Sequence, residues 1–168
     1  GHELTVTHRQ NSDLRPFDGL SVERIVCDLA NPGEVVAALD GMDWLIHSAA
    51  LIQLGWTRLD ASRRINVEAT RQLAQAARLK DVRMIHVSTV DAMAAAHDMT
   101  PACESDVDPS KPPCTYVVTK REAEREFLEQ VNRGLPGILV NPGLMFGPWD
   151  WKPSSGQMIL AVGKQFTP

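Results

Sequence analysis

The stretch Val82-Arg83-Met84-Ile85-His86-Val87-Ser88-Thr89 decides the fold, because it has the composition of a short strand and ends in two hydroxyl residues. Before it, apolar residues recur at helical spacing from about Arg63 to Leu79. After it, a helix rich in charged residues is predicted from Thr115 to Arg133. A strand between two helices is typical of a sheet whose neighbouring strands run parallel.

The same alternation of strands and helices extends over the rest of the chain. A helix is predicted after Asn31, which can cap it, with Pro32 in its first turn and Gly41 at its end. The stretches 10–19 and 90–114 are predicted to be irregular. Further strands are predicted at Leu4–Arg9, Val22–Leu29, Trp44–His47 and Gly137–Val140. This order predicts an α/β fold with a doubly wound parallel sheet and right-handed crossovers.

Small or polar residues follow each predicted strand. In doubly wound sheets, ligands bind beyond the carboxyl ends of the strands, where the strand order reverses. Small, polar or charged residues at the end of every predicted strand are harder to explain by chance than any single motif. The residues at these ends are Arg9, Asp28, Ser48-Ala49-Ala50, Ser88-Thr89 and Pro142-Gly143.

The sequence Tyr116-Val117-Val118-Thr119-Lys120 opens the charged helix and contains the only tyrosine of the chain. Residues four apart lie on the same face of a helix, so the phenol and the ammonium group are neighbours. A neighbouring cation favours the phenolate, and we therefore expect Lys120 to lower the pKa of Tyr116. Such a pair can transfer protons, although the same spacing also occurs in plain surface helices.

The amino-acid composition is typical of one globular domain. The chain has 168 residues, of which 43% are hydrophobic and 23% charged, and its net charge is −4. This charge argues against a nucleic-acid surface. The three cysteines, Cys27, Cys103 and Cys114, have neither zinc-site nor disulfide spacing, and we expect no metal and a cytoplasmic location. No apolar run reaches the roughly 18 residues of a membrane span.

Taken together, the motifs resemble those of the extended short-chain dehydrogenase/reductases. Within them, the chain is most similar to the branch that holds dihydroflavonol 4-reductase-like enzymes and hopanoid-associated sugar epimerases, with the stretch 147–153 similar to that branch in particular. The motifs that carry the resemblance are His47-Ser48-Ala49-Ala50, Asn66-Val67-Glu68-Ala69-Thr70, Val87-Ser88-Thr89, Tyr116-x-x-x-Lys120 and Asn141-Pro142-Gly143-x-x-Phe146-Gly147-Pro148.

The resemblance implies a Rossmann-type sheet and also reveals departures from it. The family begins with a strand and a Gly-x-x-Gly-x-x-Gly turn that binds the cofactor pyrophosphate, and neither is in this sequence. We therefore expect a partial NAD(P)-binding domain over 1–143 and the beginning of a substrate-binding lobe over 144–168. The missing strand is central in the order 3-2-1-4-5-6, so Leu4–Arg9 and Trp44–His47 are expected to expose unpaired edges. We expect the chain to be part of a larger protein.

The resemblance also implies residue roles. Thr89 matches the catalytic Ser/Thr that hydrogen-bonds the substrate oxygen, with Ser88 as a substitute. Tyr116 would exchange a proton with the substrate, and Lys120 would tune that phenol and bind the nicotinamide ribose. Asn66 matches an Asn near the cofactor site, with a helix cap as the alternative. We interpret His47 as a structural strand residue.

The residues at the end of the strand Leu4–Arg9 indicate whether the chain prefers NADP or NAD. Sites for NAD usually place Asp or Glu there, whereas Arg accommodates the 2′-phosphate of NADP. Arg9, with Ser12 nearby, therefore favours NADP over the alternative, NAD. The resemblance implies that the remaining cofactor contacts come from Asp28, Leu29, Ser48, Ala49, Ala50, Asn66, Lys120, Pro142 and Gly143.

The function predicted is that of an NADP-dependent oxidoreductase of the dihydroflavonol-reductase-like type. It would transfer hydride between nicotinamide and a carbonyl or secondary alcohol of a small-molecule substrate. The alternatives are an NAD-dependent nucleotide-sugar epimerase/dehydratase and a non-catalytic nucleotide-binding relative. Epimerase activity is disfavoured by Val90-Asp91-Ala92-Met93, where many epimerases carry a Tyr-Gly pair. The sequence leaves a homodimer open.

Overall fold

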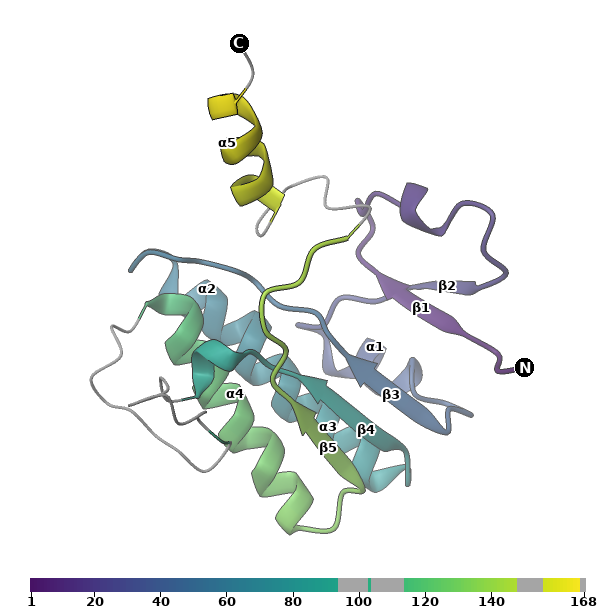
Figure 1. Ribbon diagram of the computed structural model, residues 1–168. Coiled ribbons are helices and arrows are strands. Elements are labelled where there is room, and N and C mark those ends of the chain that lie inside the picture. Colours follow the sequence, from purple (N-terminus) through teal and green to yellow (C-terminus); the bar gives the residue numbers. More distant parts are fainter. Residues whose placement is uncertain (94–102, 104–113, 148–155, 167–168) are drawn as a thin grey trace.

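A computed structural model describes residues 1–93, 103, 114–147 and 156–166 of the chain (Figure 1). The strands are β1 Thr5–His8, β2 Glu23–Val26, β3 Trp44–His47, β4 Arg83–Val87 and β5 Gly137–Val140. The α-helices are α1 Pro32–Ala37, α2 Leu59–Ser62, α3 Ala69–Leu79, α4 Thr115–Asn132 and α5 Gly156–Phe166. Shorter elements are the 3₁₀-helices η1 Arg15–Phe17 and η3 Val90–Ala92 and the π-helix η2 Arg63–Glu68. No helix among the described residues is long and apolar enough to cross a membrane.

The described strands form two parallel sheets. One pairs β1 with β2, and the other has the order β3-β4-β5. Removing the first strand from the doubly wound order 3-2-1-4-5-6 leaves the groups 3-2 and 4-5-6, which is the order found here. As predicted, β1 and β3 each pair with a described strand on one side only.

Helices cover one face of the β3-β4-β5 sheet and enclose the core. Met84 of β4, Val35 of α1, Leu73 of α3 and Phe127 of α4 are buried in one hydrophobic cluster. Helices α3 and α4 lie side by side on this face (Figure 1). Burying a large apolar side chain of this kind contributes about 1.5–3 kcal/mol to stability, so this layer supplies much of the hydrophobic stabilisation.

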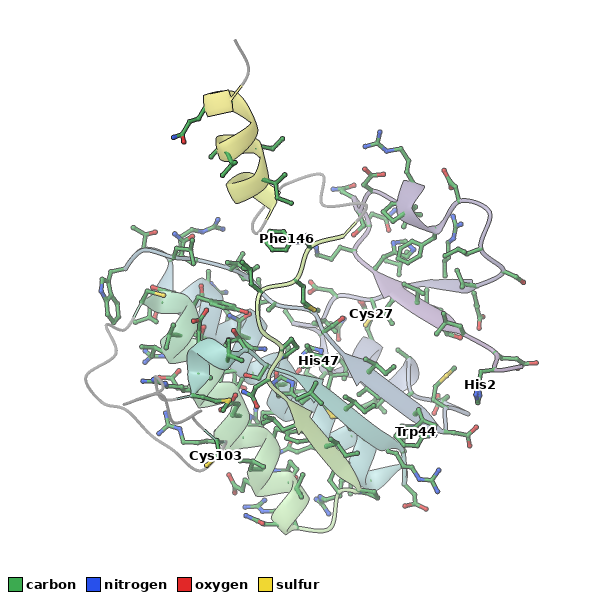
Figure 2. All side chains as sticks on the ribbon, in the orientation of Figure 1. His2, Cys27, Trp44, His47, Cys103 and Phe146 are labelled. Carbon is green, nitrogen blue, oxygen red and sulfur yellow. The ribbon has the colours of Figure 1, made fainter. Side chains whose placement is uncertain are left out.

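The opposite face of this sheet is also apolar, but its side chains are exposed. Ile46, Ile85 and Ile138 form one row across the three strands, and the two outer members are 63% and 56% exposed. Trp44, at the start of β3, is half exposed and lies under the guanidinium group of Arg83 (Figure 2). Period-two alternation therefore makes both faces of the sheet apolar, as in parallel sheets that are covered on both sides.

Most predicted elements agree with the structure to within a few residues. The strands 44–47 and 137–140 have the predicted bounds, and the Asn31 side chain accepts a hydrogen bond from the Gly33 N–H, as a cap should. Gly41 follows this helix with a φ of 73°, a conformation that favours glycine. Most of the stretch 90–114 and the segment after Gly147 that resembles the reductase branch lie outside the described residues.

Two predictions about helices were incomplete. The helix expected over 63–79 begins earlier, with the α-helical turn α2 at Leu59. It continues as the π-helix η2 over Arg63–Glu68 and then as α3. The stretch 10–19, expected to be irregular, contains the short helix η1. Neither feature has a distinct hydrophobic period, which is why pattern analysis did not find them.

Gly137 is required where β5 passes over α4. A Cβ atom at this position would lie 2.7 Å from Cζ of Phe127 and 3.0 Å from Cγ2 of Val131. Phe127 is fully buried, so its ring has little freedom to move.

We therefore expect Gly137→Ala to lower the free energy of unfolding by about 1–3 kcal/mol through overpacking. Gly55→Ala is the matched control, because a Cβ at this position would have no atom of the described residues within 4 Å. Urea unfolding of the full-length protein measures both variants, and equal stability of the two would show that β5 and α4 do not approach as described.

Candidate active site

Helix α4 carries the Tyr-x-x-x-Lys pair, and its first turn is held by the loop that follows β3. The N–H groups of Thr115 and Tyr116 donate to the carbonyl oxygens of Gly55 and Gln53, at 3.2 and 3.0 Å. The first N–H groups of a helix have no partner within it, so these bonds fix where α4 begins. They also place Tyr116 beside the loop that follows β3.

Thr89 and Tyr116 meet at the carboxyl end of β4. Thr89 is buried, and its hydroxyl oxygen accepts a hydrogen bond from the Asp91 N–H at 3.2 Å, which caps η3. Burial raises the pKa of Tyr116 and the charge of Asp91 raises it further, whereas a hydrogen bond with the Thr89 side chain lowers it. The net direction is upward, so the phenol keeps its proton at neutral pH.

The expectation that Lys120 lowers the pKa of Tyr116 is wrong for this structure. The Lys120 side chain is 2% exposed, and Nζ donates to the carbonyl oxygen of Val87 at 2.8 Å. Burial lowers the pKa of Lys120 to about 8, partly opposed by the carboxylate of Glu124. Sequence spacing placed the ammonium group on the correct helix face but could not show that burial dominates the pKa of the phenol.

Two buried histidines lie close to Lys120. The rings of His47 and His86 stack with their centroids 5.4 Å apart, and Phe127 lies at the same distance beyond His86. Burial first, and the charge of Lys120 second, lower the pKa of His47 to about 4 and that of His86 to about 2. Both rings are therefore neutral at pH 7, which supports the interpretation of His47 as a structural residue.

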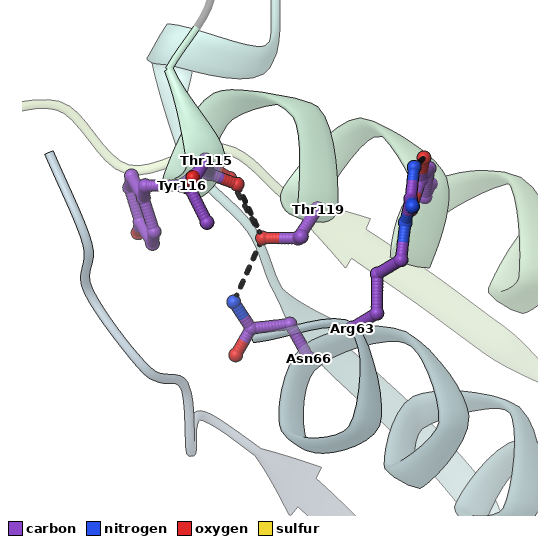
Figure 3. A network of polar contacts seen from close by, with 6 residues as sticks. Arg63, Asn66, Thr115, Tyr116 and Thr119 are labelled. Carbon is purple, nitrogen blue, oxygen red and sulfur yellow. Dashed lines mark hydrogen bonds and ion pairs between the residues drawn. The ribbon is translucent and has the colours of Figure 1, made fainter. Parts of the chain in front are cut away.

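Asn66 connects three parts of the site from within the π-helix η2. Its side chain accepts from the Leu51 N–H at 2.7 Å and donates to the Leu51 carbonyl at 3.0 Å and to the Thr119 hydroxyl at 2.9 Å. Thr119 in turn donates to the carbonyl of Thr115, and Figure 3 shows this chain of contacts next to Tyr116. Asn66 does not cap a helix; it fixes the loop after β3 against the first turn of α4.

Ser88 lies beside Thr89 but has different contacts. It is 6% exposed, its N–H donates to the Val140 carbonyl at 2.8 Å, and its hydroxyl has no hydrogen-bond partner among the described residues. The contact with the Tyr116 phenol comes from Thr89. The structure thus brings Thr89, Tyr116 and Lys120 together around the end of β4.

The residues predicted for the adenosine end lie after β1 and β2. Arg9 is exposed, and its N–H donates to the Ser12 hydroxyl at 3.1 Å, so these two residues are neighbours as expected. The Asp28 carboxylate accepts from the Ala30 N–H at 3.0 Å. Leu29 is half-buried and packs against the hydrophobic core.

The remaining predicted cofactor residues lie after β3 and β5. Ser48 and Ala49 are exposed and Ala50 is half-buried. Pro142 accepts from the Val90 N–H at 3.0 Å, and a Cβ at Gly143 would meet no atom within 4 Å. Small side chains at open strand ends leave room for a ligand to approach the backbone.

The charged residues among them differ in exposure. Arg9 and Asp28 are exposed after β1 and β2, whereas Lys120, with two N–H donors beyond its bond to Val87, is buried at the end of β4. The glycine-rich turn that would bind the pyrophosphate is not in the sequence. Among the described residues, no group of three or more His, Cys, Asp or Glu side chains is arranged to hold a metal ion.

Three residues around Thr89 were not predicted to belong to the site. Asn141 donates to the Thr89 carbonyl and to Glu124, and Arg121 donates to the Ala92 carbonyl at 2.9 Å. Glu124 follows Lys120 by four residues, just as Lys120 follows Tyr116, so an extended helical spacing could have found it. Asn141 was part of a recognised motif but had no role assigned.

The chain was compared with families of known proteins. A family model described as the NAD dependent epimerase/dehydratase family matches residues 1–167. The chain is 34% identical over 166 residues to the sterol demethylase protein B of Methylococcus capsulatus. It is 31% identical over 163 residues to a Synechocystis protein named "Putative dihydroflavonol 4-reductase". Both alignments cover 95% of this chain but only 49% and 47% of the relatives, so the chain spans about half their length.

Solved structures are similar to this fold as well. The crystal structure of gox2253 covers the whole chain with 36% identity and a TM-score of 0.89. A nucleoside-diphosphate-sugar epimerase from Pseudomonas aeruginosa covers 98% of it with 26% identity and a TM-score of 0.78. The chain covers 52% and 51% of these two proteins.

The buried histidines predict how stability depends on pH. A histidine whose pKa is lower in the folded than in the unfolded chain stabilises the fold above its unfolded pKa of about 6.5. That contribution is lost as the pH falls from about 6.5 towards 4, by up to about 1.4 kcal/mol per pH unit for each histidine. His86→Leu should therefore reduce the slope of unfolding free energy against pH over this range.

Urea unfolding of the full-length protein at several pH values between 4.5 and 7 measures this slope. His2→Leu, at an exposed position, is the control and should leave the slope unchanged. A His86→Leu slope identical to wild type would mean that His86 is not buried as a neutral ring.

Proposed function

Because the chain belongs to the NAD dependent epimerase/dehydratase family, as its motifs predicted, we propose that it is part of an NAD(P)-dependent oxidoreductase. The substrate is a small molecule that carries a carbonyl group or the corresponding secondary alcohol. The observation that carries this proposal is that the Thr89 side chain lies beside the Tyr116 phenol at the carboxyl end of β4, where it lowers the pKa of that phenol, while Lys120 is bound to Val87, the last residue of the same strand.

Carbonyl reduction needs a proton donor next to the substrate oxygen. Tyr116 suits this role because its pKa is raised and the phenol is therefore protonated at neutral pH. The Thr89 hydroxyl supplies a second hydrogen-bonding group to the same oxygen, which stabilises the negative charge that develops on it. In the reverse direction the Tyr116 phenolate accepts the proton of the alcohol, and the Thr89 hydroxyl hydrogen-bonds the same oxygen.

When bound, the nicotinamide would supply or accept the hydride. Lys120 has two N–H groups beyond the one it donates to Val87, and these would hold the nicotinamide ribose. The stretch Val90-Asp91-Ala92-Met93, where many epimerases carry a Tyr-Gly pair, favours carbonyl reduction over epimerisation.

The proposed cofactor is NADP(H). Arg9 is exposed after β1, and Ser12 lies next to it. A guanidinium group can form charge-assisted hydrogen bonds with a 2′-phosphate, whereas a carboxylate at this position would repel it. Asp13, the next acid along the sequence, forms an ion pair with Arg15.

Tyr116→Phe tests the catalytic role. It removes the proton donor but keeps the ring, so turnover in the full-length protein should fall by about 10²–10⁴-fold while cofactor affinity is unchanged. Ser88→Ala is the control, because the Ser88 hydroxyl does not supply the described contact with Tyr116. Carbonyl reduction followed by NADPH absorbance measures both, and turnover of Tyr116→Phe within twofold of wild type would contradict the role.

Arg9→Asp tests the cofactor preference. Hydrogen bonds to charged groups contribute roughly 1.5–3 kcal/mol each, which corresponds to about 10- to 150-fold in affinity. Wild-type protein should therefore bind NADPH at least about tenfold more tightly than NADH, and Arg9→Asp should shrink or reverse this ratio. The preference should weaken as salt is added, because Arg9 is exposed.

Titration of each cofactor at fixed ionic strength provides the measurement. Arg125→Asp makes the same charge change at an exposed position of α4 and should leave the ratio as in wild type. Equal affinity of the wild type for both cofactors would refute the role of Arg9, and the proposed reaction would stand without a preference for NADP.

A further inference from the structure

The backbone around Thr89 is held by side chains from two other elements. Nδ2 of Asn141, which follows β5, donates to the Thr89 carbonyl at 3.0 Å and to Oε1 of Glu124 on α4 at 2.8 Å. Arg121, also on α4, donates from Nε to the Ala92 carbonyl at 2.9 Å, at the end of η3. The turn that presents the Thr89 hydroxyl is therefore tied at both ends.

Glu124 lies on the same stripe of α4 as the proposed catalytic residues. Tyr116, Lys120 and Glu124 are spaced by four residues, so they lie along one side of the helix. All three side chains are linked to the end of β4. Tyr116 lies at the Thr89 side chain, and Lys120 binds the Val87 carbonyl. Glu124 is linked to the Thr89 carbonyl through Asn141. One helix face thus sets the position of both hydroxyl groups of the site.

From this arrangement we infer that Asn141 and Glu124 are positioning residues for the reaction, because together they fix the position of Thr89 beside Tyr116. This inference rests on the proposed function of the Thr89–Tyr116 pair. Neither residue touches the reacting atoms. They act through the carbonyl of Thr89, whose position determines where its hydroxyl points.

The chemistry of the two side chains explains why this pair suits the task. An amide nitrogen has two N–H donors, and Asn141 uses one for Thr89 and one for Glu124. An ionised carboxylate only accepts hydrogen bonds, so Glu124 requires the nitrogen of Asn141, and not its oxygen, to face it. That orientation is the one that can also donate to the Thr89 carbonyl.

Glu124 has a second effect that a purely structural residue would lack. Its negative charge raises the pKa of Lys120 and keeps the ammonium protonated to higher pH. The other titratable groups near Lys120 are His47 on β3 and His86 on β4, which are neutral across the alkaline range, and Tyr116 on α4. Removing the charge of Glu124 should therefore move the alkaline loss of activity to lower pH.

The experiment compares Asn141→Ala, Glu124→Ala, Glu124→Gln and the double alanine variant in the full-length protein. Each alanine variant should lower kcat by at least about tenfold, with the cofactor Kd unchanged, because small misplacements of catalytic groups cost this much. The double variant should be no worse than about threefold below the poorer single variant, because residues in one network are not additive.

Glu124→Gln separates positioning from charge. The glutamine oxygen can still accept from Asn141, so kcat at the pH optimum should stay within about threefold of wild type. The alkaline limb of the kcat/KM profile should nevertheless shift to lower pH, because the charge near Lys120 is gone. Glu129→Gln is the matched control: it removes the same charge from the exposed side of α4 and should change neither quantity.

The outcomes distinguish this inference from the proposed function. If Tyr116→Phe loses turnover but the Asn141 and Glu124 variants do not, or if their effects simply multiply, the positioning role is wrong and the proposed function stands. If Tyr116→Phe keeps full turnover, the proposed function fails and the inference fails with it. Thermal unfolding of every variant identifies any that do not fold, and Glu124→Gln, which keeps size and hydrogen bonding, then decides through its pH profile.

Discussion

The hydrogen bond from the buried Lys120 ammonium to the Val87 carbonyl is the contact on which the rest of the site depends. It ties the second turn of α4 to the last residue of β4, and so sets the distance between the helix that carries Tyr116 and the strand end that carries Thr89. A buried ammonium group is costly unless it is paired, which leaves this side chain little choice of position. The proposed chemistry therefore begins with a constraint on the packing of one helix against one strand.

The electrostatics around this lysine follow from the same burial. His47 and His86 remain neutral because desolvation and the nearby charge both oppose their protonation, so Lys120 is the one cation in this layer of the described core. The carboxylate of Glu124 partly compensates for it. The layer thus combines one positive charge with neutral rings, an arrangement in which a small change in charge has a large effect on pKa values.

The loops after β3, β4 and β5 converge on α4 by different means. Asn66 binds both backbone groups of Leu51 after β3, Asn141 binds the carbonyl of Thr89 after β4, and both asparagines also contact a residue of α4. Asparagine suits these positions because one side chain can donate and accept at once. The π-helical turn around Asn66 is consistent with this role, since such turns often occur at functional sites.

By itself the sequence determined the order of strands and helices, the parallel sheet and the residues of the Thr89, Tyr116 and Lys120 set. These depend on local composition and on fixed spacings, such as the four residues between Tyr116 and Lys120, which a helix converts directly into proximity. The family of the chain followed from the same motifs.

Only the tertiary structure decided what these residues contact. The pKa of Tyr116 rises instead of falling because burial and Asp91 outweigh other influences, and neither is visible as a spacing in the sequence. The side chain of Asn66 joins the Leu51 backbone to the Thr119 hydroxyl. Asn141 and Glu124 gained roles because β5 and α4 meet at the end of β4. Hydrogen bonds between residues far apart in the chain and the loss of solvent depend on how the elements pack. This is why the sequence predicted that Thr89, Tyr116 and Lys120 lie together but not their electrostatics.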